Sequence, residues 1–366
     1  MTELLLHGTH ESWNGCFTGI NGAEVVDHYG DPLAEHAALC ETAGVLDLSF
    51  RGRLCVTGPD RKRFLHGQVT NNVKDLEPGA GCYAALVTAK GKMQSDLNIY
   101  CLDDELLLDF EPGLSAAIAG RLEKYIIADD VHCIDVAPLY GLLTVQGPRA
   151  AEVIRGLGPT LPLATQPLGS VVLKELDLGE VYCTTQARGL TAGYDLFVPA
   201  PFLATMADRL MTSARRVGGR PCGWRALEWA RVEAGTPRYG ADMDESNLPP
   251  ETGIEERAVS YSKGCYIGQE VIARIRTYGQ VARSLRGLCL PADMPELPKK
   301  GDKLFAGEKE VGYITSAVAS PRFRRNLALG YVRRECNQPG TELRLRTAGA
   351  EWTVTTAALP FVFETP

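Results

Sequence analysis

An internal repeat constrains the fold of this chain more than any other sequence feature. Gly58 and Gly147 each stand in a Gly-Pro pair between an apolar run and a helix-like segment, and they are 89 positions apart. Pro112 and Pro201 separate a second pair of such segments, and they are also 89 positions apart. Repeated strand, turn and helix signals predict two tandem α+β units, each a sheet covered by helices. The alternative is a coincidence between common turn signals.

The pattern changes toward the C-terminus. From residue 283 onward, short β-like runs alternate with turns rich in proline and glycine, which is typical of a small β-barrel or sandwich. Residues 242–256 carry six carboxylates and no lysine or arginine, and we expect a solvated connector there. The predicted organisation is a first unit with the N-terminal segment at 1–140, a second unit at 141–282 and a β-barrel at 283–366.

Composition excludes several classes of protein. The chain has 366 residues, a net charge of −7 and no apolar run near the roughly 20 residues that a membrane-spanning helix needs. The acidic balance argues against stable binding to nucleic acid or to an anionic membrane. The first residues, MTELLLHG, lack the basic start and the longer apolar stretch of a signal peptide. We therefore expect a cytoplasmic protein with neither kind of partner.

The eleven cysteines indicate neither a disulfide framework nor a metal site. They are spread over the chain with no Cys-x-x-Cys pair and no cluster with histidine at zinc-binding spacing. A dispersed, odd number of cysteines is typical of reduced thiols in a reducing compartment. His7 and His10 have no third ligand nearby in the sequence, and we expect two solvated side chains. The sequence therefore predicts no metal.

The densest candidate for chemistry is the segment SKGCYIGQEVIAR at 262–274. The chain lacks the nucleophile elbow G-x-S-x-G, a phosphate loop, the zinc motif H-E-x-x-H and a G-x-G-x-x-G loop. Cys265 follows Lys263 and precedes a predicted helix that begins near Gly268. A lysine and a helix N-terminus both favour thiolate over thiol, so Cys265 is the cysteine best placed to react. The alternative is a buried structural cysteine in a tight loop.

A second candidate lies in the predicted strand at 90–100. Alternation with a period of two puts Asp96 and Tyr100 on one polar face, where Tyr83 of the preceding strand would join them. An aspartate between aromatic rings suits recognition of the donor edge of a heterocycle or of a developing cation. A half-exposed strand without a ligand explains the same pattern equally well.

Charged residues further along the chain form a third candidate. Residues 263–286 carry a net charge of +4 within an acidic protein, which suits either a solvated face or the tail of an anionic ligand. Arg231 follows Glu228 by three positions on a predicted helix, so an ion pair on the helix surface is its simplest role.

Two segments together resemble a known family. K-G-C-Y-I-G-Q-E at 263–270 and FLHGQVTNNVKDLEPGAGCYAALVTAKGKMQSDL at 64–97 resemble the YgfZ-type folate-binding proteins, relatives of the glycine-cleavage T-protein, an aminomethyltransferase. The resemblance extends from about residue 30 into the C-terminal region. It implies an α+β, T-protein-like arrangement of two ferredoxin-like units and a β-barrel around a central hole that admits tetrahydrofolate.

The resemblance also implies roles for individual residues. Asp96 matches the T-protein aspartate beside the reactive pterin nitrogen, although Ser95 stands where that family has a second aspartate. Cys265 is the implied functional thiol of the YgfZ motif. The residues with an implied role in folate binding are Tyr83, Asp96, Tyr100, Asp195, Arg231, Glu233 and Lys263.

The leading hypothesis is a tetrahydrofolate-binding, YgfZ-like protein that assists assembly or repair of iron–sulfur clusters. Its partners would be reduced folate and the iron–sulfur client or assembly proteins. The alternative is a tetrahydrofolate-dependent aminomethyltransferase, or a methyltransferase or demethylase, in which Asp96 is catalytic. A third hypothesis is an interaction module with a vestigial folate pocket.

Overall fold

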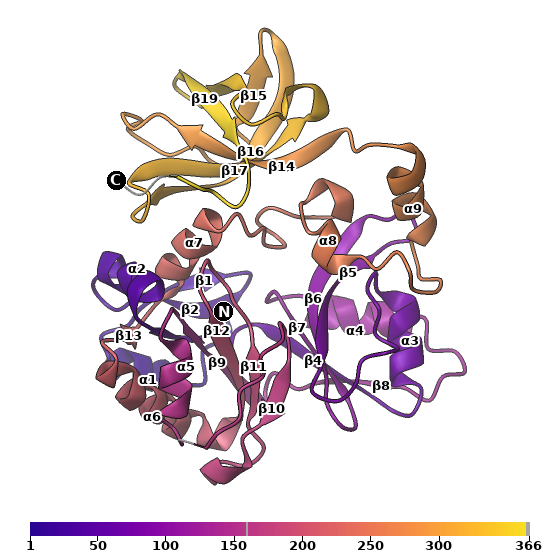
Figure 1. Cartoon of the computed structure of the whole chain (residues 1–366), viewed down its shortest axis with the longest axis vertical. Coiled ribbons are helices and arrows are strands. Elements are labelled where there is room, and N and C mark those ends of the chain that lie inside the picture. The colour runs from indigo at the N-terminus through magenta and orange to yellow at the C-terminus, as the bar shows by residue number, and fades with distance from the viewer. Residues whose placement is uncertain (159, 364–366) are drawn as a thin grey trace.

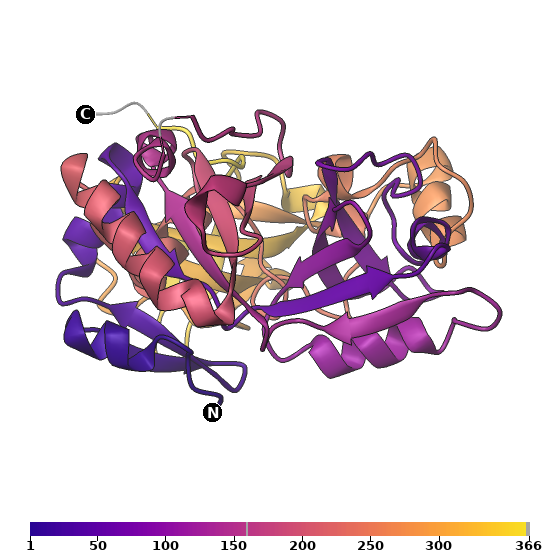
Figure 2. The same ribbon diagram turned by 90° about the horizontal axis from the view of Figure 1, so that it is seen from below.

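Two mixed α+β units and a closed β-barrel make up the structure, a computed structural model that describes residues 1–158 and 160–363 (Figure 1). The predicted fold class is therefore confirmed. Seen from below, the two α+β units lie side by side (Figure 2). In Figure 1 the barrel, coloured orange to yellow, lies above both units.

The first unit is a five-stranded antiparallel sheet with two helices packed on one face. Its strand order is β5-β6-β7-β4-β8. The strands are β4 (Gly52–Thr57), β5 (Gly81–Val87), β6 (Met93–Cys101), β7 (Leu106–Phe110) and β8 (His132–Asp135). The helices α3 (Arg61–Gln68) and α4 (Ser115–Glu123) bury Leu65, Ile118 and Leu122 in one core with the sheet.

The second unit is a six-stranded sheet with helices on both faces. Its strand order is β10-β11-β12-β9-β3-β13. The strands are β3 (Gly44–Asp47), β9 (Tyr140–Gln146), β10 (Ser170–Val172), β11 (Tyr182–Thr185), β12 (Gly193–Pro199) and β13 (Arg220–Pro221). The helices are α5 (Ala150–Arg155) and α6 (Leu203–Arg216) on one face, and α2 (Pro32–Glu41) and α7 (Trp224–Glu233) on the other.

Helix α6 shows why this unit folds as it does. Its buried residues recur three or four positions apart, as Leu203, Met206, Leu210 and Ala214 do, so one apolar stripe faces the sheet. The short 3₁₀ turns of this unit are η1 (Lys174–Leu176) and η2 (Ala200–Phe202).

The 89-residue repeat has a structural counterpart. Gly58 follows β4 and Gly147 follows β9, and both have positive φ, +98° and +131°. A Cβ at Gly58 would lie 2.1 Å from the carbonyl oxygen of Asp130, and one at Gly147 would lie 2.5 Å from that of Thr42. Asp130 lies just before β8, which pairs with β4, and Thr42 lies just before β3, which pairs with β9. The same tight turn therefore serves both units, and only glycine fits it.

The C-terminal part is a closed six-stranded barrel in the order β14-β17-β16-β15-β18-β19. Its strands are β14 (Arg283–Leu290), β15 (Lys303–Ala306), β16 (Lys309–Ser320), β17 (Arg325–Arg333), β18 (Glu342–Arg346) and β19 (Glu351–Ala357), with the 3₁₀ turn η4 (Arg334–Cys336). Closure leaves no free sheet edge, and inward-facing Leu304, Ile314 and Leu345 fill the interior.

The N-terminal segment packs with the second unit and not, as predicted from the sequence, with the first. It contains α1 (His7–Ser12) and the hairpin of β1 (Cys16–Ile20) and β2 (Ala23–His28). Strand β3 lies between β9 and β13. Its four residues are buried and pair with β9, and Gly44 and Val45 also pair with β13. His10 is also buried, against expectation, since its ring bonds to Asp47 and to the Tyr29 hydroxyl.

The acidic segment 242–256 is not a solvated connector. Asp242, Glu251 and Ile254 are buried, and the segment forms η3 (Pro249–Glu251) and the start of α8 (Glu255–Ala258). Asp242 bonds to Arg231 of α7 and to the Thr315 and Ser316 hydroxyls of the barrel. The acidic composition of residues 242–256 therefore did not indicate whether they are exposed.

The segment around Cys265 lies on the first unit, although the predicted boundaries placed it with the second. Tyr266 and Ile272 share a core with Val87 of β5 and Met93 of β6. Helix α9 (Gln269–Tyr278) follows and leads to the barrel, as the chain path in Figure 1 shows. Among the helices of residues 1–158 and 160–363, none combines the length and apolarity needed to cross a membrane.

Candidate functional site

A cavity of about 720 Å³ lies between the two α+β units, and helix α7 of the second unit forms part of its wall. Its lining comes from β5, β6, the loop before β12, α7 and the loop that follows α7. A volume of this size is typical of small-molecule sites. Five arginines and three carboxylates line it: Arg51, Arg188, Arg231, Arg238, Arg257, Asp96, Glu111 and Glu228. No barrel residue occurs in the part of the lining that the structure describes.

Asp96 and Tyr83 meet on the wall of this cavity. They lie on adjacent antiparallel strands, and the Tyr83 hydroxyl donates to Oδ2 of Asp96 at 2.8 Å. The other carboxylate oxygen, Oδ1, is buried and has no hydrogen-bond partner among the described residues. Burial raises the pKa of Asp96, as does the charge of Glu111, while the Tyr83 bond opposes the rise. A carboxyl group in this state can accept a ligand's proton or hydrogen bond.

Buried ion pairs fix Arg51 and Arg188 in the cavity wall. Arg51 Nε donates to Asp109 Oδ1 at 2.7 Å, and Arg188 contacts Asp109 Oδ2 at 3.3 Å. Arg188 is also held by Asp195 at 2.5 Å. Asp195 is fully buried on β12 and does not line the cavity, so it positions Arg188.

Arg231 lines the cavity, but its donors are already used. The predicted pair with Glu228 is present, at 2.8 Å from Nη2 to Oε2. The same guanidinium bonds to the buried carboxylate of Asp242 and to the Ser316 hydroxyl of the barrel. Arg231 therefore ties α7 to the barrel behind the cavity wall.

Besides Asp195, three more of the residues predicted to bind folate lie outside the cavity lining. Tyr100 shares a strand face with Asp96, but at its end of β6 that face packs against Phe197 in the core between the sheets. Glu233 faces His36 and the barrel, beside a separate small cavity. Lys263 is buried and donates to the carbonyl oxygens of residues 66, 69 and 71.

Lys263 acts as a clamp. Burial lowers its pKa to about 8, and its three carbonyl acceptors lie in the last turn of α3 and just beyond the end of that helix. These bonds fasten the segment that carries Cys265 to the first unit. The Cys265 side chain itself is exposed and does not line the cavity.

The basic run at 263–286 does not supply the cationic lining. Arg283 contacts Glu251 and lies over the ring of Tyr331, and Arg286 donates to the carbonyl of Asn337. Apart from Arg231, the arginines that line the cavity were not predicted from the sequence; Arg51 and Arg188 are examples. The one sequence signal that could have revealed this network is Asp109, a charged residue inside the apolar strand LLLDF.

Family comparison gives this geometry a context. The family model of the GCVT N-terminal domain matches residues 6–263, and that of the glycine cleavage T-protein C-terminal barrel domain matches residues 283–362. The chain belongs to the glycine-cleavage T-protein family. Residues 264–282, which include Cys265, fall between the two matches.

T-protein relatives match almost the entire chain. An aminomethyltransferase from Corynebacterium jeikeium is 29% identical over 396 residues and covers 99% of both chains. A probable aminomethyltransferase from Halobacterium salinarum is 30% identical over 370 residues and covers 98% of both. The crystal structure of the aminomethyltransferase T of the Bartonella henselae glycine cleavage system has a TM-score of 0.89 at 23% identity, with 99% of this chain and 98% of that chain covered. That last likeness concerns the fold.

Proposed function

We propose that this protein is a tetrahydrofolate-dependent one-carbon transferase of the T-protein type, acting on an aminomethyl or methyl donor. The observation that carries the proposal is the Asp96 carboxylate on the cavity wall. One of its oxygens is held by Tyr83, and the other is buried without a partner among the described residues. The relatives named aminomethyltransferase support this reading better than the YgfZ-like one.

The cavity suits a reduced folate. Its lining combines the rings of Tyr83 and Trp224 with the apolar side chains of Leu48 and Leu168, which suits a flat heterocycle. The guanidinium of Arg257 lies 5.0 Å from the centre of the Tyr83 ring, and it would attract the carboxylates of a folate tail. When bound, tetrahydrofolate would supply a ring nitrogen that accepts the one-carbon unit.

Asp96 would act through charge and proton affinity. Its free oxygen would accept a hydrogen bond from a ring nitrogen or stabilise positive charge that develops there. Because Tyr83 fixes the other oxygen, the carboxyl group is oriented before the ligand arrives. Burial and the charge of Glu111 raise the pKa of Asp96, so the carboxyl group holds a proton more readily than an exposed aspartate does.

Anaerobic calorimetry with tetrahydrofolate, combined with an assay of one-carbon transfer from an aminomethylated or methylated donor, tests this function. We expect Asp96→Asn to lower kcat by about 100-fold while the Kd for tetrahydrofolate changes by less than about tenfold. Asp104→Asn, at an exposed turn, is the control and should match the wild type. Absence of binding heat, or full turnover by Asp96→Asn, would contradict the proposal.

A second candidate function uses Cys265 and is the YgfZ-like role in iron–sulfur cluster assembly or repair. The observation that favours it is an exposed thiol on a loop clamped by Lys263, in the stretch that neither T-protein family model matches. A transferase that works through Asp96 needs no thiol at this place.

Complementation of cells that lack their native factor separates the two functions. If the second function holds, Cys265→Ser abolishes recovery of iron–sulfur enzyme activity, and Asp96→Asn has the smaller effect. Cys16→Ser, which alters another exposed thiol, is the matched control. The reverse order of effects would leave the transferase function alone.

A further inference from the structure

A group of three metal-ligating side chains lies outside the main cavity. His36 and Cys40 are one turn apart on α2, and Glu233 ends the facing helix α7. Among the described residues, their Nε2, Sγ and carboxylate oxygen atoms lie within 4.8 Å of one another. Nε2 of His36 is 2.8 Å from Oε2 of Glu233 and 3.8 Å from Sγ of Cys40. None of the three lines the cavity assigned to folate.

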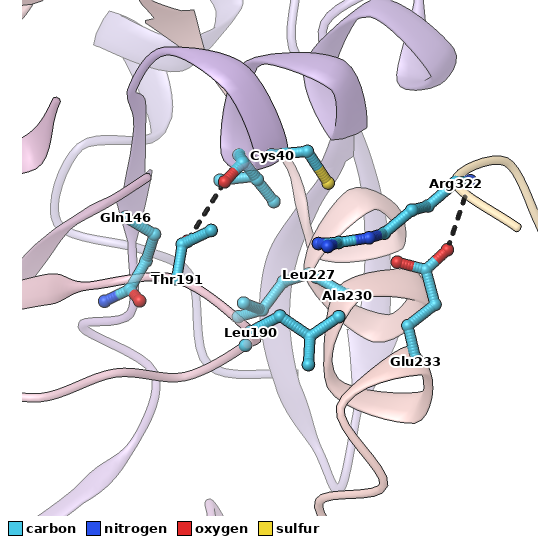
Figure 3. Close-up of a pocket in the computed structure, with 10 residues that line it drawn as sticks. Cys40, Gln146, Leu190, Thr191, Leu227, Ala230, Glu233 and Arg322 are labelled. Atoms are coloured by element: carbon cyan, nitrogen blue, oxygen red, sulfur yellow. Dashed lines mark hydrogen bonds between the residues drawn. The ribbon is translucent and has the colours of Figure 1, made fainter. Parts of the chain in front are cut away.

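The surroundings hold this group in place. The Ser320 hydroxyl donates to Oε1 of Glu233 at 2.5 Å, which leaves Oε2 turned toward His36. His36 and Glu233 are buried and Cys40 is partly exposed. A cavity of about 10 Å³ adjoins Cys40 and Glu233, as Figure 3 shows, which is room for about one water molecule.

The geometry points to a zinc-binding site formed by His36, Cys40 and Glu233, with a water from the small cavity as fourth ligand. Thiolate, imidazole and carboxylate are a donor set that Zn²⁺ binds. Tetrahedral Zn²⁺ separates its N and S ligands by about 3.5 Å and its N and O ligands by about 3.3 Å. The observed 3.8 Å and 2.8 Å therefore require shifts of about half an ångström. Binding would release the thiol proton and the proton shared by His36 and Glu233 to solvent.

The neighbouring arginine limits the strength of this site. Arg322 lines the same small cavity, and Figure 3 shows its side chain reaching toward Cys40. Its positive charge opposes that of a bound cation, so removing the charge should increase the affinity for metal. Because Ser320 ends β16 and Arg322 lies in the turn that follows, bound Zn²⁺ would fasten α2 and α7 beside the barrel.

Titration of the full-length protein with Zn²⁺, in competition with a chromophoric chelator, tests the site. We expect one Zn²⁺ per chain and a higher unfolding temperature with Zn²⁺. Cys40→Ser should weaken the affinity by about 100-fold and abolish the thermal shift, whereas Cys16→Ser should bind as the wild type does. Titration with Co²⁺ should give a thiolate charge-transfer band that Cys40→Ser loses.

Two further variants keep the test independent of a folding defect in Cys40→Ser. His36→Gln should weaken Zn²⁺ binding to a similar extent, and Arg322→Gln should strengthen it by about tenfold. Zn²⁺ binding of unchanged affinity in Cys40→Ser and His36→Gln would overturn the proposal, because the metal would then sit elsewhere. Absence of a Co²⁺ thiolate band in the wild type would overturn it as well.

Discussion

Asp109 shows how one buried charge organises the cavity wall. It is fully buried and accepts hydrogen bonds from Arg51 and Asn98, with Arg188 at 3.3 Å. Burial alone would raise the pKa of Asp109, but the charges of Arg51 and Arg188 and the hydrogen bonds lower it to about 2. The folded chain therefore depends on the ionised form of this carboxyl group.

We predict that Asp109→Asn lowers the free energy of unfolding by about 3 kcal/mol at pH 7, because two buried guanidinium groups lose their shared counter-charge. The pKa is lower in the folded chain than its ordinary value of 3.8. This contribution is therefore fully present above about pH 4 and is lost as the pH falls toward about 2. Urea unfolding of both proteins at a series of pH values measures the difference.

The stability gap between the wild type and Asp109→Asn should narrow over that acid range. Asp104→Asn, at an exposed position, should show no gap at any pH. A gap of constant size from pH 7 to pH 2 would show that Asp109 does not stabilise the fold through its charge.

At the scale of elements, the turns after β4 and β9 decide how each sheet closes. In both turns the residue two positions after the glycine donates its backbone N–H to the carbonyl oxygen that lies against that glycine. Asp60 donates to Asp130, and Arg149 donates to Thr42. Strand β3 thus takes beside β9 the place that β8 takes beside β4. The 89-residue spacing between Gly58 and Gly147 therefore corresponds to the same glycine–carbonyl contact in both units.

We predict that Gly58→Ala and Gly147→Ala each destabilise the fold by about 3 kcal/mol or more. Each combines a positive φ with a Cβ that would overlap a carbonyl oxygen of the main chain, which cannot move aside as a flexible side chain can. Thermal unfolding is a sufficient measurement. Gly120→Ala in α4 is the control, because a Cβ there meets nothing within 4 Å.

The control should be as stable as the wild type or slightly more so, since alanine favours helix over glycine by about 1 kcal/mol. Equal stability of Gly58→Ala, Gly147→Ala and Gly120→Ala would refute a special role for the two turns.

At the scale of the whole molecule, Asp242 joins the barrel to the α+β units. Strand β16 has a bulge between Ile314 and Ser316, which turns the neighbouring hydroxyls of Thr315 and Ser316 toward the same carboxylate oxygen. The Arg231 guanidinium holds the other oxygen of Asp242. The barrel therefore supports the cavity from behind.

We predict that Asp242→Asn loosens the barrel by about 3 kcal/mol, because the buried guanidinium of Arg231 loses one of its two carboxylate partners and keeps only Glu228. Scanning calorimetry should show one transition for the wild type and a separate, earlier barrel transition for the variant. Hydrogen exchange should increase first in β16 and β17. Asp293→Asn, at an exposed barrel position, should leave both measurements unchanged. A single transition at the wild-type temperature in Asp242→Asn would contradict this role.

Local patterns determined much of this protein. Turn signals and apolar runs are properties of neighbouring residues, so the repeat and the change of pattern at residue 283 predicted two α+β units and a barrel. The pairing of Tyr83 with Asp96 was also within reach, because adjacent antiparallel strands place their polar faces together.

Tertiary structure alone decided which distant charges meet. Asp242 was expected to be solvated because its neighbours are acidic, yet it is buried against Arg231 and the barrel. The expectation of no metal stays a prediction, but folding brings Glu233 of α7 to His36 of α2 across 197 positions. Sequence spacing carries no information about such contacts, because the packing of whole elements sets their distances.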